Sequence, residues 1–582
     1  MIGDKPSSSD LPAPALLFFH TKRAQFNDKR EQMSQERNEF LEDWKGIGDH
    51  VRTRRGKRLS KSNRKNTRNK AILNETGIFN SRVLGAGMMG GVASPSRPWV
   101  KLTTPNSDLN EIKAVKLWLD KAQRVFYRIL AGSNYYGTRH RSFRDMGDFG
   151  QGPMLIDEDA EDVINSYVSP AGEYLLGVDH RGRRDTLYRE MSMTVLQIVT
   201  KFGRNAPREV LEKYDRGEYQ APFEVIHVIE PNIRQIKGQL GPLGMPFLNL
   251  YYCEGVEDGD ANSIMQTRGY HEMPFSSPPW EVDGQLDAYG DGCGALILQA
   301  SKSLQALEKR KGQIVDKLAV PPTQAPASIK GKSKIDHAPG KNTWYPDQAQ
   351  GQGGAGHGPI TPLYKIDPNS LTVLSAEEQA IVNRMDRGYF VDLFLMVSRD
   401  DRRNQTATEV VEKHEEKLIA LGPVLENTHS EGLDYEVRRI FNIAARGGAI
   451  PPPPKEMDGS PLKAEYTSIL AVAQRAIGVG QIERYSGFLG NLAAGDPQVM
   501  DKWDRDQTVD EYTDALGVPA SMVRSDDEVE QLRKQRAQKE QQDESMSQAM
   551  VAAEGAKVLS EADTSRDSNL LADILGGSVG RV

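Results

Sequence analysis

The chain has 582 residues, of which 38% are hydrophobic and 27% charged, with a formal net charge of −7 at pH 7. At about 150 residues per domain this length predicts about four structural units, and the composition excludes a wholly disordered or collagen-like chain. No apolar run approaches the length that spans a bilayer, and the N-terminus lacks the positive cluster of a secretory signal. Two cysteines, Cys253 and Cys293, are too few for a disulfide framework or a cysteine zinc site. We therefore expect a soluble protein of several parts, made in a cytosol.

The charge is unevenly distributed along the chain. Ten basic residues and no acidic residue fall between positions 52 and 70: Arg52, Arg54, Arg55, Lys57, Arg58, Lys61, Arg64, Lys65, Arg68 and Lys70. Such a block can neutralise phosphates or fit an acidic partner, although the negative total argues against a surface that coats nucleic acid everywhere. A solvated basic linker or helix face is an equally good explanation. The block therefore predicts an anionic partner without identifying it.

Three helices are predicted in the N-terminal part. The charged stretch 23–47 fits a surface helix, and 71–92 fits a second helix, whose small residues would permit close approach of a neighbouring element before Pro95 ends it. The clearest helix spans 109–130, where one apolar stripe recurs at spacings of three and four. The stripe consists of Ile112, Val115, Leu119, Ala122, Phe126 and Ile129.

Strand patterns follow between 154 and 230. We predict strands at 173–178, 185–192 and 223–229, with a hairpin turn at 179–183. Together with the helices, these strands predict a mainly helical α+β fold.

The second half is predicted to be helical again. A helix at 295–318 and another at 375–395 flank an excursion rich in Pro, Gly and Lys, which is too long for a passive connection and predicts a projecting module with a flexible tip. Thr-Ala-Thr-Glu over 406–409 fits a capping box that opens a helix reaching about residue 445. After a proline run, 463–494 and 511–516 are predicted to be helical, as is the first part of the tail.

Motifs of catalysis and metal binding are weak. Gly331, Lys332 and Ser333 imitate the end of a phosphate-binding loop, but Pro326 stands where that loop needs a glycine amide. The acidic run 157–162 lacks the glycine and spacing of a calcium loop, so a solvated acidic loop is the better interpretation. No His-Glu-x-x-His or Gly-x-Ser-x-Gly pattern occurs. We expect no enzyme, no cofactor and no metal, although scattered groups that converge in space leave a DNA-processing enzyme as an alternative.

Five short signatures occur in a characteristic order. They are Gly-Met-Met-Gly-Gly-Val-Ala-Ser-Pro-Ser-Arg-Pro-Trp over 87–99, Tyr-Gly-Asp-Gly-Cys-Gly-Ala over 289–295, Thr-Ala-Thr-Glu-Val over 406–410, Arg-Arg-Ile-Phe over 438–441 before Gly447, and Leu-Gly-Val-Pro over 516–519 before Arg524. This order resembles the head-to-tail connecting, or portal, proteins of short-tailed, podovirus-type bacteriophages. Gln405 departs from it, because the family commonly has Met there. The resemblance covers about 75–530, so it assigns no role to the basic block.

The resemblance implies a dodecameric ring at the unique capsid vertex of the virion, assembled in the bacterial host cytoplasm. The terminase motor would drive double-stranded viral DNA inward through the central channel, and a tail adaptor would dock before ejection. Major capsid, scaffold and internal core proteins are further implied partners, with no membrane, cofactor or catalysis. The alternatives are another ring or adaptor protein of the virion, or a packaging enzyme.

The resemblance also implies a division into wing, stem, clip and crown. The predicted regions are an N-terminal wing at 1–290 with a basic arm at 52–70, stem helices at 291–318 and 373–397, a clip at 319–372, a channel loop and wing helix at 398–450, a crown at 451–560, and a disordered tail at 561–582.

Three groups of site residues follow from this division. The loop expected to face DNA in the channel contains Arg399, Asp400, Asp401, Arg402 and Arg403, for which an exposed polar turn is the alternative. Of the adjacent stem charges, at most two can face the channel, and the others must pair between subunits or meet outer partners; these are Lys309, Arg310 and Lys311. The clip docking surface contains Lys330, Lys332, Lys334, His337, Lys341, Trp344 and Tyr345, with local packing as the alternative for Trp344.

Overall fold

The computed structural model describes residues 23–53, 72–106, 109–110, 112–255, 263–326, 339–345, 361–364, 367, 369–398, 419–457, 462–468, 470, 479–493, 495, 501–516 and 526–561. The chain divides into two compact units, Met1–Ile477 and Gly478–Val582. Among the described helices, none is long and apolar enough to cross a membrane.

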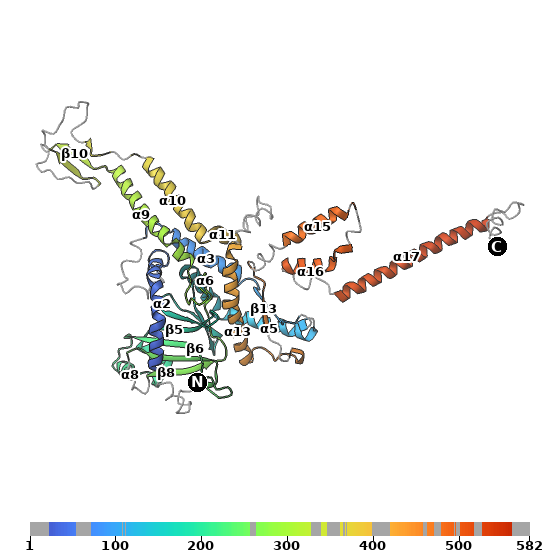
Figure 1. The fold of residues 1–582 in the computed structure, drawn as a ribbon, viewed down its shortest axis with the longest axis horizontal. Coiled ribbons are helices and arrows are strands. Elements are labelled where there is room, and N and C mark those ends of the chain that lie inside the picture. The colour runs from blue at the N-terminus through green and yellow to red at the C-terminus, as the bar shows by residue number, and fades with distance from the viewer. Residues whose placement is uncertain are drawn as a thin grey trace, which may run out of the picture. The chain divides into compact units, whose positions relative to one another are not determined.

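Four helices build the N-terminal part of the first unit (Figure 1): α2 (Arg23–His50), α3 (Thr76–Val92), α5 (Lys113–Gly132) and α6 (Tyr135–Phe149). The three predicted helices are confirmed, with shifted ends. The apolar stripe of α5 is buried from Val115 to Ile129, whereas Ile112 lies before the helix and is exposed. α2 is more than a surface helix, because Trp44 and Ile47 are buried in the main core.

A five-stranded antiparallel sheet occupies one end of this unit. Its order is β4-β5-β6-β7-β8, formed by β4 (Tyr174–Val178), β5 (Arg184–Thr194), β6 (Pro222–Pro231), β7 (Phe247–Cys253) and β8 (Ile264–Tyr270). The first three strands and the turn before β5 match the prediction, and the other two were not predicted. Phe26 of α2 packs on one face, and the short helices α7 (Val195–Phe202) and α8 (Arg208–Asp215) cover the other.

Two smaller sheets connect distant parts of the chain. β2 (Met154–Asp159) pairs antiparallel with β3 (Val163–Val168) and with β9 (Phe275–Ser276). β1 (Val100–Thr103) pairs antiparallel with β13 (Lys463–Tyr466). The predicted helix at 463–494 is therefore wrong at its start, since long-range strand pairing overrides the helical propensity of Lys, Ala and Glu there.

The predicted pair of helices after residue 290 is present but divided differently. α9 (Cys293–Ala319) packs against α10 (Asn369–Gly388), and the predicted 375–395 helix breaks after Gly388, where Phe390 has a positive φ of 52° before α11 (Val391–Ser398). Helical residues 419–427 lead through the π-helical turn η6 (Thr428–Leu433) into α13 (Asp434–Arg446). Three-residue 3-10 turns occur at η2 (Gly203–Asn205), η3 (Pro242–Gly244) and η7 (Lys455–Met457).

The described residues of the second unit are mainly helical. It contains α15 (Val479–Ala493), α16 (Arg505–Leu516) and α17 (Asp526–Glu561). Arg533 of α17 forms a bidentate ion pair with Asp506 of α16, at 2.6 and 2.7 Å. The helices predicted at 511–516 and after residue 530 are confirmed.

Glycine residues set the closest contacts of the first unit, as the small residues of 71–92 predicted. A Cβ at Gly87 of α3 would lie 2.2 Å from a ring carbon of Phe394 in α11, and one at Gly294 would lie 2.1 Å from the carbonyl oxygen of Asp148. No real side chain tolerates such distances. Two of the sequence signatures thus have a structural reason: they bring α11 onto α3 and the start of α9 onto the end of α6.

We predict that Gly87→Ala lowers the free energy of unfolding by about 1–3 kcal/mol, because the added methyl overpacks the α3–α11 contact. Gly90→Ala in the same helix is the matched control, since nothing lies within 4 Å of its Cβ position. There the higher helix propensity of Ala should stabilise the protein by up to about 1 kcal/mol. Chemical denaturation of both variants measures the difference; equal effects of the two substitutions would contradict the prediction.

Candidate functional site

The helix pair α9 and α10 extends from the body of the first unit to a small sheet at its tip (Figure 1). One face of the basal part of α9 is buried between Cys293 and Gln305, and Ile381 and Met385 are buried at the base of α10. In the described distal segments 306–319 and 369–380, no residue is buried. The two helices are therefore fixed at their base, whereas their distal halves contact mainly each other and solvent.

The predicted stem charges do not act as a group. Lys311 of α9 pairs with Glu378 of α10, with 2.6 Å between Nζ and Oε2. This hydrogen bond raises the pKa of Lys311 and lowers that of Glu378. Lys309 and Arg310 are exposed. Lys311 therefore has a partner in its own chain, and whether these charges face the channel, pair between subunits or meet outer partners stays a prediction.

The tip of the helix pair is a three-stranded sheet with the order β11-β10-β12. β10 (Thr323–Pro326) runs parallel to β11 (Asn342–Tyr345) and antiparallel to β12 (Thr361–Pro362). Lys341 is exposed, Trp344 is half-buried beside Ala325, and Tyr345 ends β11. Lys330, Lys332, Lys334 and His337 lie outside the described residues, as does the segment that imitates a phosphate-binding loop.

A buried carboxylate joins the base of the helix pair to the body. Asp148 of α6 accepts hydrogen bonds from Ser81 of α3 and from Tyr389 between α10 and α11, at 2.7 and 2.8 Å. Arg52 forms ion pairs with Asp148, at 3.2 Å, and with Asp145. Burial raises the pKa of Asp148, and the charge of Arg52 opposes this shift.

This cluster corrects one expectation from the sequence. Arg52, the first residue of the predicted basic block, is buried and paired with carboxylates of the same chain, so it is not part of a surface for an anionic partner. The remaining positions of the block lie outside the described residues. The sequence offered no signal for Asp148, because an isolated aspartate near a helix end ordinarily indicates a solvated position.

The predicted channel loop follows directly after α11. Arg399, Asp400, Asp401, Arg402 and Arg403 lie outside the described residues, as does the predicted capping box at 406–409. α11 itself is firmly placed, because Val391, Leu393 and Phe394 are buried and Phe394 packs on Gly87. The structure therefore fixes where this segment begins, after Ser398.

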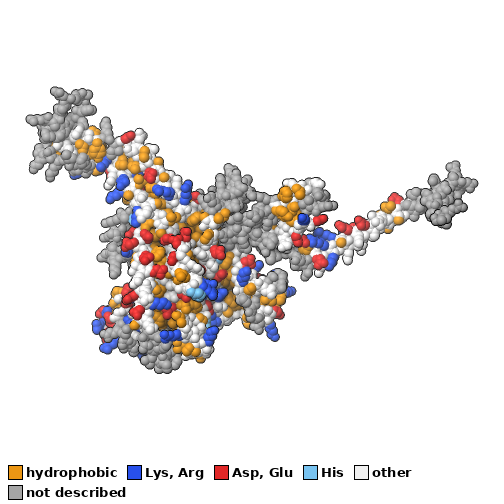
Figure 2. Space-filling model, viewed as in Figure 1, with side chains coloured by type: hydrophobic (Ala, Val, Ile, Leu, Met, Phe, Trp, Pro, Cys, Tyr) orange, Lys and Arg blue, Asp and Glu red, His pale blue; other side chains and the backbone are white. Residues whose placement is uncertain are grey.

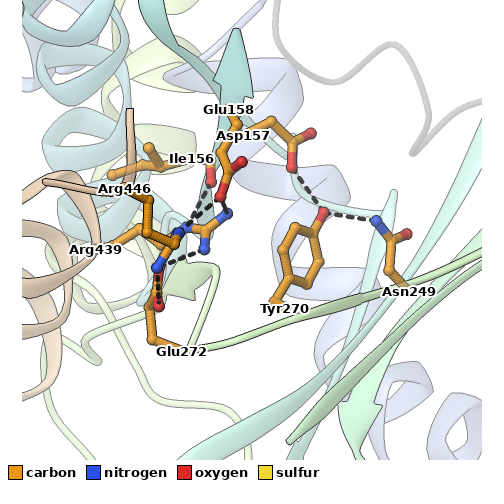
Figure 3. A network of polar contacts seen from close by, with 8 residues as sticks. All are labelled: Ile156, Asp157, Glu158, Asn249, Tyr270, Glu272, Arg439 and Arg446. Carbon is orange, nitrogen blue, oxygen red and sulfur yellow. Dashed lines mark hydrogen bonds and ion pairs between the residues drawn. The ribbon is translucent and has the colours of Figure 1, made fainter. Parts of the chain in front are cut away.

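A second polar network ties α13 to the sheets (Figure 3). Glu272 accepts a hydrogen bond of 2.6 Å from Arg439 and two from Arg446, at 2.8 and 2.9 Å. Arg446 also contacts Glu158 at 2.8 Å, while Tyr270 donates to Asp157 at 2.7 Å. Arg439 belongs to the fourth sequence signature. That signature therefore helps to hold α13 against the sheets.

The acidic run 157–162 is more ordered than the solvated loop that the sequence predicted. Asp157 and Glu158 belong to the network above, and Asp159 accepts hydrogen bonds from the backbone amides of Glu161 and Asp162. Within the part of the chain that the structure describes, no group of His, Cys, Asp or Glu side chains is placed to hold a metal ion.

Comparison with known proteins identifies the family. The family model of the bacteriophage head to tail connecting protein matches residues 23–523. The chain belongs to this family. It is 36% identical over 555 residues to the portal protein of Salmonella phage epsilon15, covering 95% of this chain and 98% of the relative. It is 35% identical over 556 residues to the probable portal protein of Bordetella phage BPP-1, with the same coverage.

Two solved assemblies also contain similar chains. One is the neck of an empty gene transfer agent particle, with 9% identity, a TM-score of 0.31, and coverage of 70% of this chain and 86% of the other. The second is the virion of the native gene transfer agent particle, with 10% identity, a TM-score of 0.32, and coverage of 77% and 90%.

The family gives the connector its general function. It is a phage portal protein with a structural role, it belongs to the junction of head and tail in the virion, and its partners are capsid and tail proteins. The resemblance noted in the sequence is confirmed at this level.

The Glu272 network makes a pH-dependent prediction. Burial disfavours the charged form of Glu272, but hydrogen bonds from Arg446 and Arg439 outweigh it and hold the pKa below the ordinary value of 4.5. A lowered folded-state pKa adds stability above the unfolded-state value, and this stability is lost as the pH falls through the folded-state value. Glu272→Gln should therefore destabilise the protein at pH 7 by about 1–3 kcal/mol, and the deficit should shrink below about pH 4.5.

Denaturant unfolding at pH 7, 5 and 3 measures this deficit. Glu212→Gln on α8 is the control, because that carboxylate is exposed and pairs with Arg208 and Arg216, four residues away on either side; its effect should stay within about 0.5 kcal/mol. A Glu272→Gln deficit that is independent of pH would contradict the electrostatic explanation.

Proposed function

We propose that the connector assembles through head-to-tail contacts between copies into a closed ring, with twelve copies as the family resemblance implies, around a channel for double-stranded viral DNA. The observation that carries this proposal is the exposed distal half of the helix pair. Apolar side chains of both distal segments are exposed, including Val315 of α9 and Val373 of α10, at 47% and 69%. Such side chains favour burial by neighbouring copies, and heterologous contacts that close produce a ring.

In this proposal the body is the wing, α9 and α10 are the stem, and the tip sheet is the clip. The crown comes from the C-terminal region. The pairing of β13 with β1 and the unit boundary after Ile477 favour a crown that begins near residue 478 rather than at 451. Internal core proteins would meet this region, and assembly with scaffold protein would take place in the host cytoplasm.

The clip would dock the terminase during packaging and the tail adaptor afterwards. Its sheet lies at the end of the helix pair, where Lys341 is exposed and Trp344 is half-buried. A partly exposed aromatic side chain beside a lysine suits an interface anchor. The short strand β12 also leaves backbone groups at the sheet edge that a partner can pair with.

The segment after α11 would form the channel loop. Arg399, Arg402 and Arg403 would place three positive charges per copy near passing phosphates, and Asp400 and Asp401 would partly cancel them. Partial cancellation suits DNA that must slide, because fewer neutralised phosphates mean weaker binding. The buried packing of α11 on α3 supports the proposal, since it gives the loop a rigid attachment.

The ring is tested by native mass spectrometry with electron microscopy of the purified chain. Twelve copies of the 64.6 kDa chain give a mass of about 775 kDa, and closed rings with an axial hole should be visible. A stable monomer or dimer in the presence of scaffold protein would contradict the proposal.

The channel loop is tested by replacing Arg399, Arg402 and Arg403 with alanine. Ring formation should be unchanged, while DNA packaging or retention in an infection or packaging assay should fall. The control removes three cations at α8 and its C-terminal end, which pair with Glu209 or Glu212, and should package normally: Arg208→Ala, Lys213→Ala and Arg216→Ala. Loss of the ring in the loop variant would show that these arginines are structural.

A further inference from the structure

The outward face of α5 carries an unusual concentration of positive charge. The helix contains five basic residues and one acidic residue, Asp120, although the whole chain has a net charge of −7. All five basic side chains are exposed: Lys113, Lys116, Lys121, Arg124 and Arg128. Figure 2 shows basic side chains at the edge of the body where Figure 1 places α5.

These charges form a line along the helix. At 3.6 residues per turn, Lys113, Lys121, Arg124 and Arg128 fall within an arc of about 80°, and they span about 22 Å of helix length. Duplex DNA presents one phosphate per about 1.7 Å of axis, so a segment of this length offers about a dozen phosphates to four cations.

The cations of α5 have no partners within the described part of the chain. No ion pair or hydrogen bond of these five side chains occurs there, in contrast to α8. On α8, Arg208 and Arg216 pair with Glu212, and Lys213 pairs with Glu209, at 2.9 to 3.5 Å. The cations at α8 are paired with carboxylates, whereas α5 leaves its five exposed cations available to an anion from outside.

Hydrogen bonds on both sides of this line hold α5 in place, and its opposite face is buried in the core. Trp118 donates its indole N–H to the carbonyl oxygen of Pro451 at 2.9 Å. Tyr127 donates its hydroxyl to the carbonyl oxygen of Val100 at 2.8 Å and accepts the backbone N–H groups of Trp99 and Val100, each at 2.9 Å. A line of charge on a fixed helix binds an anionic partner with little loss of backbone entropy.

We propose that this face of α5 is a second DNA-binding surface, separate from the channel loop, which contacts the phosphate backbone of duplex DNA without sequence preference. The proposal rests on the proposed function, in which the connector handles viral DNA. Lines of Lys and Arg suit phosphate contacts, whereas lysines are depleted at the core of protein interfaces, and Leu117 is the one exposed apolar side chain within this line. A protein with −7 net charge repels DNA on average, so DNA contacts require local groups of cations, of which this line is one.

The test measures binding of the purified full-length chain to a random 40-base-pair duplex by fluorescence anisotropy, between about 50 and 200 mM salt. Lys121→Ala, Arg124→Ala and Arg128→Ala are combined in one variant, because alanine preserves the helix. We expect affinity to fall roughly tenfold or more at 0.1 M salt, and the log–log salt slope to decrease by about two to three.

Three variants measured in parallel separate the possible explanations. The α8 control variant makes the same change in net charge and should bind DNA like the unmodified chain. A charge-preserving variant, Arg124→Lys with Arg128→Lys, should keep most of the affinity, because positive charge is what the proposed phosphate contacts require. DNA packaging by the channel-loop variant tests the proposed function independently of the α5 surface.

The inference is overturned if the α5 variant binds the duplex with unchanged affinity and salt slope. It is also overturned if that variant keeps DNA affinity but loses binding to purified capsid shells, which would assign the face to an acidic protein surface. In either case a packaging defect of the channel-loop variant would leave the proposed function intact.

Discussion

The buried carboxylate of Asp148 is the constraint on which the position of the projecting helices depends. It accepts hydrogen bonds from α3 and from the residue that follows α10, and it pairs with Arg52 beyond the end of α2. The carbonyl oxygen of the same residue leaves room only for a glycine at Gly294 in α9. A buried charge is strongly destabilising unless all its partners are in place, so this cluster favours one arrangement of the helices at the base of the pair α9 and α10.

The sequence predicted those elements whose pattern is local and long. α5 and α9 were found because apolar residues recur with helical spacing and prolines or glycines mark the ends, and β4, β5 and β6 because β-rich runs are separated by turn residues. The glycine-rich signature of α3 was correctly predicted to be a site of close approach. The structure adds that the residue packed against it is Phe394. The family resemblance rested on the same short motifs.

Features that depend on distant partners were not predictable. The strand β13 exists because β1 lies beside it, and its own residues favour a helix. The break before α11 follows from Tyr389 reaching Asp148 and from Phe390 adopting a positive φ, neither of which has a periodic signal. Arg52 and Lys311 were grouped with surface cations because sequence spacing does not show which carboxylate they meet. Within the candidate site, the structure describes Lys341, Trp344 and the stem charges. The role of the channel loop stays a proposal.

Some charged side chains of the connector have ion-pair partners within the chain, whereas other charged and apolar side chains are left exposed. This difference distinguishes the parts that stabilise the fold from the parts available for binding. In the body, charges that lie near the core are matched: Arg439 by Glu272, Arg139 by Glu436 and Arg52 by two aspartates. Along the distal helix pair, apolar side chains are exposed, and along α5 a line of cations has no carboxylate partner in the described chain. In the proposed ring, neighbouring copies would bury the exposed apolar side chains, whereas the unpaired cations would bind an anion. The proposed ring assembly and the proposed DNA contacts require these two kinds of surface, and in this chain the two surfaces lie on different elements.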